Sequence, residues 1–222
     1  MIDLEPLLLS FEVATVATCL ATVLGVALAG VLATPRVWGR EFLDAAISAP
    51  MVLPPTVLGY YLLVLLGRES GIGRSFEALF GTPIVFSRGG AIIAATIGAL
   101  PLITKATRAA LESVDTRLVG AARTLGASEL RAFFSVSLPL ARRGILAGVM
   151  LGFARALGDF GVTLMVAGNI PGQTRTASLA IYDAVLSGRD ADAVQLSLIM
   201  TALAMLVLIA ASYLTKHRRD GF

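Results

Sequence analysis

Two opposite charges, Arg155 and Asp159, interrupt an otherwise apolar stretch of the chain. Each charge would cost about 2.5–3.5 kcal/mol at the centre of a helix that faces lipid, so both side chains must face protein or water. Their spacing of four residues permits an ion pair within one helix, in which Asp159 neutralises Arg155 and has a structural role. Alternatively, Arg155 lends positive potential to a passage for an anion, and Asp159 prevents the anion from being trapped. The sequence leaves both interpretations open.

A second group of candidates lies in the polar segment 168–195. Asn169, Thr174 and Arg175 offer neutral polar groups and one guanidinium, which suit a dianion that approaches from outside a membrane. A solvated loop without a binding role has the same composition. The residues alone do not decide between a pathway mouth and a plain loop.

Adjacent prolines, Pro54 and Pro55, lie within another apolar stretch and are followed by Thr56. The pair removes two N–H donors and frees nearby carbonyl groups, which lipid cannot satisfy. This segment therefore either lines a hydrated translocation pathway or forms a structural kink against a neighbouring helix.

Residues that enzymes and metal sites require are scarce. The chain has one cysteine, Cys19, and one histidine, His217, and no second acid lies near Asp159 in the sequence, so we predict neither a metal site nor a catalytic centre. A P-loop needs Gly-Lys-Ser/Thr, but Lys105 and Lys216, the only lysines, each follow a threonine. We therefore predict a chain that is not an enzyme, binds no cofactor and depends on a partner to use ATP.

The elements that must position these residues are long apolar helices. Of the 222 residues, 56% are hydrophobic and 15% are charged, with a mean hydropathy of +0.82, whereas soluble domains carry roughly a quarter charged residues. About 20 apolar residues cross the hydrocarbon layer of a membrane. The sequence predicts a single all-α integral membrane domain, residues 1–222, with about five spans at 7–33, 42–66, 84–104, 144–167 and 196–214.

Lysine and arginine collect on one side of the predicted spans. Twelve lie on the side that holds residues 105–143 and five lie on the other side, and positively charged flanks stay in the cytoplasm. The protein is therefore expected in the cytoplasmic (inner) membrane with its N-terminus outside and its C-terminus inside. Because the basic residues flank apolar segments and do not form one face, no nucleic-acid partner is expected. No Lys or Arg precedes Arg36, so the first apolar stretch is expected to be a retained span.

The cytoplasmic segment 105–143 is long enough for two or three short helices. Gly126 is expected to break its middle, and Pro139 to mark the entry to the fourth span. Apolar residues recur there at helical spacing: Leu118, Ala121, Ala122 and Leu125. Such a stripe either lies on the lipid headgroups or is offered to a cytoplasmic partner.

Small residues recur at steps of four in the fourth predicted span, at Gly144, Gly148, Gly152 and Ala156. A face of this kind lets another helix backbone approach closely. The partner helix can belong to the same chain or to a second copy in a homodimer, and the sequence does not choose.

One run in the cytoplasmic segment resembles the EAA motif of ABC importer permeases, EAA-x3-G-x9-I-x-LP. It consists of Gly120-Ala121-Ala122, Gly126, Val136 and Leu138-Pro139, and Gly120 is the one departure because the family usually has Glu there. The resemblance implies a type I importer permease fold with a cytoplasmic coupling helix that docks on an ATPase subunit. The residues that it assigns to this role are Gly120, Ala121, Ala122, Arg123, Gly126, Ala127, Leu138 and Pro139.

Further stretches are similar to molybdate permeases, namely residues 49–60, 121–127, 153–161 and 169–176. Sulfate permeases share parts of this pattern but are usually longer, with an extra N-terminal span. The resemblance implies a membrane subunit that translocates molybdate, and with it tungstate, by alternating access. A sulfate or thiosulfate importer remains the alternative.

The same resemblance implies a set of partners. Two copies of the chain would form a homodimeric pore in the lipid bilayer, two ABC ATPase subunits would bind the cytoplasmic loops, and an extracytoplasmic oxyanion-binding protein would deliver the cargo.

Overall fold

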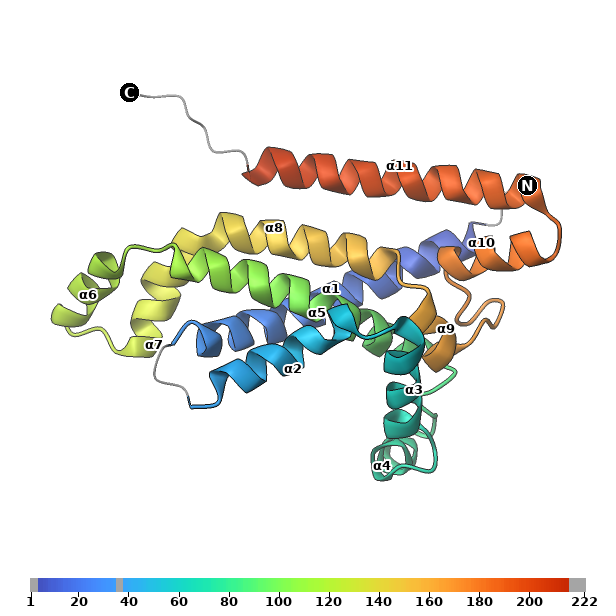
Figure 1. Cartoon of the computed structure of the whole chain (residues 1–222), viewed down its shortest axis with the longest axis horizontal. Coiled ribbons are helices and arrows are strands. Elements are labelled where there is room, and N and C mark those ends of the chain that lie inside the picture. Colours follow the sequence, from blue (N-terminus) through green and yellow to red (C-terminus); the bar gives the residue numbers. More distant parts are fainter. Residues whose placement is uncertain (1–3, 35–37, 216–222) are drawn as a thin grey trace.

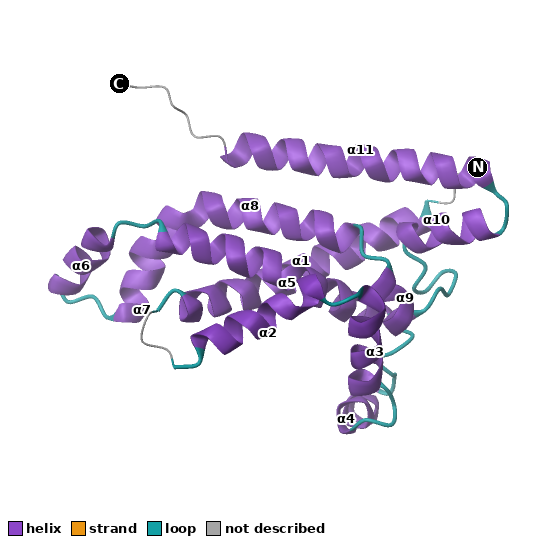
Figure 2. Ribbon diagram, viewed as in Figure 1, coloured by secondary structure: helices purple, strands orange, loops and turns teal. Residues whose placement is uncertain are grey.

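A computed structural model describes residues 4–34 and 38–215, and within these ranges every regular element is a helix (Figure 2). In chain order the helices are α1 (Glu5–Leu32), α2 (Arg40–Val52), α3 (Pro55–Leu66), α4 (Gly71–Phe80), α5 (Arg88–Glu112), α6 (Thr116–Thr124), α7 (Glu129–Ala132), the π-helical segment η1 (Phe133–Ser137), α8 (Leu138–Leu157), α9 (Gly161–Ala167), α10 (Ala177–Leu186) and α11 (Asp190–Thr215).

Long helices form a bundle along the longest axis of the molecule (Figure 1). Within the described residues, four helical runs are long and apolar enough to cross a membrane: α1, α5, the continuous run of α7, η1 and α8, and α11. The bent pair α2–α3 makes a fifth span if it is counted as one. The all-helical fold with about five spans confirms the class predicted from the sequence.

The core of the bundle lies where α1 and α8 pack on α5. Ala14, Ala17 and Ala21 are fully buried at steps of three and four residues. Next on the same stripe, a Cβ at Gly25 would lie 3.1 Å from Cγ2 of Ile103. Small side chains on α1 therefore let its backbone approach α5 closely, which increases dispersion contacts where lipid provides no hydrophobic driving force.

The second predicted span, 42–66, is not one continuous helix. α2 ends at Val52, α3 begins at Pro55, and the two helices are bent by 114°. Pro55 has no N–H to donate to the preceding turn and its ring clashes there, while proline is well suited to a first helical position. As a result α3 and α4 extend away from the bundle (Figure 1), and the predicted span 42–66 corresponds to the bent pair α2–α3.

Two further boundaries differ from the predicted ones. α5 continues eight residues beyond position 104, to Glu112, and the helical run before Leu157 begins at Glu129 instead of 144. Both helices extend through polar turns outside the apolar segment, where a hydropathy pattern gives no signal. The predicted cytoplasmic segment 105–143 thus holds the end of α5, the whole of α6, α7 and η1, and the first turns of α8.

The segments predicted as loops also contain helices. α4 lies in the segment between the second and third predicted spans, and α10 lies in the segment 168–195. Both are ten residues long, too short to cross a membrane alone.

The bundle has two distinct ends (Figure 1). α6 and α7 lie at one end, and α9 and α10 lie at the other, where α1 also begins. α11 starts beside α10 and runs back along α8 toward the end that holds α6. Four of the basic residues used to predict orientation, Arg36, Lys216, Arg218 and Arg219, lie outside the described residues.

Candidate functional site

The break between α8 and α9 positions Asp159. α8 ends at Leu157, and Asp159 lies in the three-residue connection before α9. Its Oδ2 accepts hydrogen bonds from the backbone N of Thr163 at 3.0 Å and from Thr163 Oγ1 at 2.7 Å. Asp159 therefore satisfies an N–H in the first turn of α9, in the manner of a helix cap.

The same carboxylate holds Arg155. Nη1 of Arg155 lies 2.8 Å from Oδ1 of Asp159, and the arginine side chain is 37% exposed whereas the aspartate side chain is 2% exposed. Within the described residues Asp159 is the only side-chain or backbone acceptor that Arg155 reaches. The ion pair is present, and other N–H groups of the guanidinium meet no acceptor in the part of the chain that the structure describes.

A glycine of α5 makes room for this guanidinium. A Cβ at Gly98 would lie 3.4 Å from Nη2 of Arg155, and the next two nearest atoms also belong to the guanidinium. Glycine in a helix interior costs roughly 0.5–1 kcal/mol relative to alanine. In return, the missing side chain leaves room for the guanidinium of Arg155. Sequence reasoning missed Gly98, because nothing in the sequence places it beside α8.

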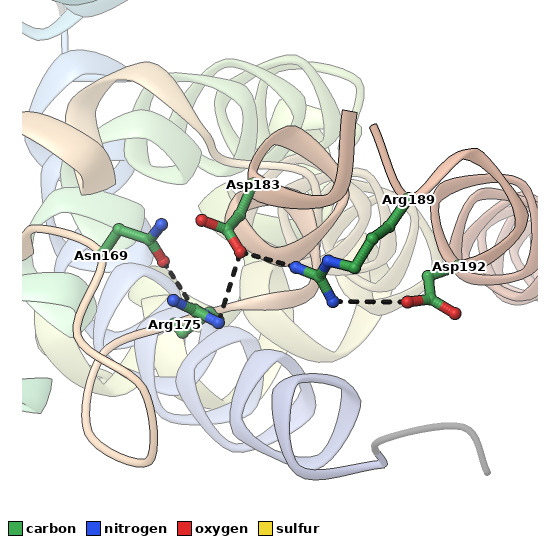
Figure 3. Close-up of polar contacts among 5 residues, drawn as sticks. All are labelled: Asn169, Arg175, Asp183, Arg189 and Asp192. Atoms are coloured by element: carbon green, nitrogen blue, oxygen red, sulfur yellow. Dashed lines mark hydrogen bonds and ion pairs between the residues drawn. The ribbon is translucent and has the colours of Figure 1, made fainter. Parts of the chain in front are cut away.

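The polar candidates after α9 are bound to one another (Figure 3). Nε of Arg175 donates to Oδ1 of Asn169 at 3.0 Å, and its Nη1 lies 3.5 Å from Asp183 of α10. Asp183 also pairs with Arg189 at 2.9 Å, and Arg189 with Asp192 at 3.3 Å. The charges in this chain of contacts balance, so Arg175 is largely neutralised.

Thr174, the third candidate in this segment, is fully buried. Its hydroxyl accepts from the backbone N of Ile170 at 3.0 Å and donates to the carbonyl of Gly168 at 3.2 Å. In this conformation the hydroxyl closes the turn of its own loop and is not offered to an anion.

Arg88 at the start of α5 ties the same loop to the bundle. It donates to the carbonyls of Gly172 and Gln173, each at 3.2 Å, and lies 3.5 Å from Glu12 of α1. In the sequence, Arg88 counted only as one of the five basic residues on the side opposite the predicted cytoplasmic side. Its contacts with this loop were not predicted.

The proline kink lies against α9. A Cβ at Gly161 would lie 2.7 Å from Cβ of Pro55, and a Cβ at Gly59 would lie 2.6 Å from Cβ of Met165. The kink thus packs on a neighbouring helix, as one of the two predicted alternatives requires. Pro54 and Thr56 are exposed, so this face also remains open to a pathway.

At the opposite end, α6 stands away from the bundle. None of its residues is buried, and the apolar side chains of Leu118 and Leu125 are 50% and 89% exposed. Asp115 begins the helix by accepting from the backbone N of Arg117 at 2.8 Å. Gly126 ends it with a φ of 90°, a conformation that favours glycine. The predicted break at Gly126 is therefore confirmed.

The residues assigned to coupling divide between two elements. Gly120, Ala121, Ala122 and Arg123 lie on α6, with Gly126 and Ala127 in the turn that follows, whereas Leu138 and Pro139 are the first two residues of α8. Arg123 pairs with Glu129 of α7 at 3.1 Å. η1 ends at Ser137, two residues before Pro139, and the wider π turn suits a proline that cannot donate to the preceding turn.

A cavity of about 710 Å³ lies behind α6. Val119 and Gly120 of α6, Gly30 of α1, Leu111 of α5 and Phe133 of η1 are among the residues that line it. α6 contacts η1 and α7, so the rest of the chain holds this helix mainly from one side.

The small-residue face of α8 packs within the chain. A Cβ at Gly144 would lie 2.5 Å from Cβ of Ala110, and one at Gly148 would lie 2.7 Å from Cβ of Ala106. One at Gly152 would lie 2.6 Å from Cδ1 of Ile103, and Ala156, the fourth member of the stripe, is buried as well. The close helix approach left open by the sequence is thus an intrachain contact of α8 with α5.

Residues 21–219 match the family described as binding-protein-dependent transport system inner membrane component. The chain belongs to this family. It is therefore a multi-pass inner-membrane permease, a transport component and not an enzyme. Such permeases work with a substrate-binding protein and with an ATPase that uses ATP. These findings confirm the predicted class and the resemblance to importer permeases.

Curated relatives match the permease over nearly its whole length. The "Molybdenum transport system permease protein ModB" of Escherichia coli K12 is 41% identical over 97% of this chain and 95% of its own length. The protein of the same name from Haemophilus influenzae is 38% identical, over 97% and 94%. A "Probable sulfate transport system permease protein cysT" of Chlorella vulgaris is 34% identical over 95% of this chain but only 80% of its own length.

Solved transporter structures share the fold. A chain of the inward-facing MetNI methionine ABC transporter has a TM-score of 0.77 at 17% identity, over 96% of this chain and 94% of that one. A chain of a bacterial alginate ABC importer has a TM-score of 0.72 at 13% identity, over 98% and 80%. At these identities the likeness concerns the fold alone.

Proposed function

We propose that this permease is the membrane-spanning subunit of an ATP-driven importer that translocates molybdate, and tungstate with it, into the cytoplasm. The observation that carries the proposal is the 41% identity over 97% of the chain to a molybdenum transport permease of nearly equal span. The sulfate permease of Chlorella is less similar and extends beyond the region it shares with this chain. Sulfate or thiosulfate import is therefore the second candidate.

In the proposed assembly two copies of the chain form the pore. No residue of α6 is buried, and Leu118 on this helix and Leu125 directly after it are exposed, which suits docking in a cleft of the ATPase. The end of the bundle that holds α6 then faces the cytoplasm, and the end that holds α10 faces the binding protein. This orientation puts the N-terminus outside and the C-terminus inside.

The transport cycle follows from two states of one bistable membrane element. ATP binding by the partner would draw the two α6 helices together and open the pore toward the binding protein, and hydrolysis would restore the inward-open state. The permease residues in this scheme position, pass and release the anion, and α6 transmits the motion.

Of the predicted pathway residues, Arg155 is the best placed to contact an oxyanion. Its guanidinium is partly exposed and bound on one edge only, whereas Arg175 is bound to Asn169 and Asp183. Asp159 reduces the positive charge at Arg155, so that an anion is attracted but also released.

A competition assay tests the proposal. The permease, its ATPase and its binding protein would be reconstituted in proteoliposomes, and uptake of labelled molybdate and of labelled sulfate would be measured. We expect ATP-dependent molybdate uptake that excess tungstate inhibits and that equimolar sulfate leaves unchanged. Sulfate uptake that excess molybdate does not reduce would assign the chain to the second candidate function.

A further inference from the structure

Lys105 lies on the helix α5, one residue beyond the apolar segment predicted as the third span. It is the eighteenth of the 25 residues of α5, and its side chain is exposed. Within the described residues it forms no hydrogen bond or ion pair. An ammonium group at the end of an apolar segment must reach water, so its face of α5 is hydrated at this depth.

Lys105 shares a face of α5 with Gly98, over which the Arg155 guanidinium lies. Seven residues make nearly two helical turns, so the two positions differ by only about 20° around the axis and by about 10 Å along it. Leu102, four residues after Gly98, lies between them on the same face and is half-buried. Two cationic groups thus follow one another along one stripe of the bundle.

We infer that Arg155 and Lys105 form two successive contact points for a tetrahedral oxyanion on its way through the membrane, and that Gly98 and Asp159 position the first. The inference rests on the proposed function and adds to it a second cation and the order of contacts. A separation of about 10 Å is too large for one small oxyanion to bridge. The anion would therefore pass from the first cation to the second, which avoids a single tight site that holds it.

The two cations differ in the way that such a transfer requires. Arg155 is paired with Asp159 at 2.8 Å, whereas Lys105 has no hydrogen-bond or ion-pair partner among the described residues. The attraction for an anion therefore increases from Arg155 to Lys105, toward the end of the bundle that holds α6. The Gly98 position matters because a branched side chain there would push the guanidinium away from both Asp159 and the stripe.

The main test measures the electrical potential at Leu102 with thiol reagents. Leu102→Cys would be introduced into a Cys19→Ser background of the full transporter. The reaction rates of the introduced thiol would be compared for the anionic 2-sulfonatoethyl and the cationic 2-(trimethylammonium)ethyl methanethiosulfonates. We expect the ratio of anionic to cationic rates to fall about tenfold in Lys105→Gln and in Arg155→Gln. Molybdate should slow the anionic reagent. An introduced thiol that reacts with neither reagent, or a ratio that neither variant changes, would overturn the inference.

Uptake measurements separate a pathway role from a structural one. We expect Lys105→Gln to lower the maximal molybdate uptake per ATP hydrolysed by about tenfold, and Lys105→Arg to restore most of it. Gly98→Val should lower it as well, whereas Gly89→Val, an exposed position on the same helix, should not. Arg74→Gln, which removes an exposed arginine of α4, is the control for loss of charge.

The two proposals fail in different ways. If the wild-type transporter imports sulfate and no molybdate, the proposed cargo is wrong, and the reagent ratio of the Leu102→Cys variant still tests the stripe. If the wild type imports molybdate and Lys105→Gln imports it equally well for each ATP, Lys105 is not a contact point for the anion. The proposed function then still stands.

Discussion

At the scale of single residues, Asp159 has two separable tasks. It accepts hydrogen bonds from Thr163 at the start of α9, and it balances the charge of Arg155. Asparagine caps a helix about as well as aspartate does, but it carries no charge. Substitutions at this position can therefore remove one task and leave the other.

We expect Asp159→Asn to keep the fold and to slow anion release. A fully charged Arg155 holds an oxyanion more tightly, so the maximal uptake rate should fall while the amount of molybdate retained by the purified transporter rises. Asp159→Ala removes both tasks and should also lower the free energy of unfolding by about 1–3 kcal/mol. Equilibrium binding and thermal unfolding of the detergent-solubilised transporter would measure the two effects. Unchanged retention in Asp159→Asn would limit Asp159 to a structural role.

The pairing of Arg155 with Asp159 could be predicted from the sequence, because two charges four residues apart on an apolar helix have few other partners. The roles of Gly98 and Arg88 could not be predicted. Each contacts residues that are distant in sequence, and a single chain gives no signal for such a contact. The donors of the segment after α9 were predicted as candidates, but the sequence could not show that Thr174 and Arg175 bind their own loop.

At the scale of elements, α6 is a helix of which no residue is buried, although it contacts η1 and α7. Its exposed leucines would be costly in water if they were never covered, although single exposed apolar residues are common. Leu125, which follows the last residue of α6, is 89% exposed. This makes it a sensitive position for a test of docking.

We expect Leu125→Asp to weaken binding of the ATPase by about tenfold, because a charge would have to be desolvated at the interface. Leu79→Asp, at a position that is 80% exposed on α4, is the matched control and should leave binding unchanged. Titration of the purified ATPase against each permease variant in nanodiscs gives the affinities. Equal affinities for the two variants would rule out docking at this end of α6.

Element types were easier to predict than element ends. Apolar length predicted α1 and α11 well, because lipid demands about 20 apolar residues wherever a chain crosses it. It failed for α5 and α8, whose polar turns continue the helix beyond the apolar segment, and for α2–α3, where a proline pair redirects the chain. α4 and α10 are too short to be recognised by such a length criterion.

At the scale of the whole molecule, the two ends of the bundle differ in composition and packing. α6 and the cavity behind it lie at one end, and the balanced charges of Arg175, Asp183, Arg189 and Asp192 lie at the other. The proposed orientation assigns the first end to the ATPase and the second to the binding protein.

Single cysteines introduced into a Cys19→Ser background test this orientation. Ser187→Cys, at the end of α10, should react with a membrane-impermeant maleimide in intact cells. Thr124→Cys, at the end of α6, should react only after the membrane is permeabilised. The reverse pattern would place α6 out of reach of any cytoplasmic ATPase and would refute the proposed import function.

α8 runs without a break from Leu138 to Leu157, whereas α7 and η1 before it turn away from its direction (Figure 1). Arg155 lies 17 residues after Leu138, which is about 26 Å at 1.5 Å per residue. If α8 behaves as a rigid lever arm with its pivot at η1, a tilt of about 7° displaces Arg155 by about 3 Å, roughly the length of one hydrogen bond. A small rotation imposed at one face of the membrane is therefore enough to form or break a hydrogen bond between Arg155 and an anion near the other face.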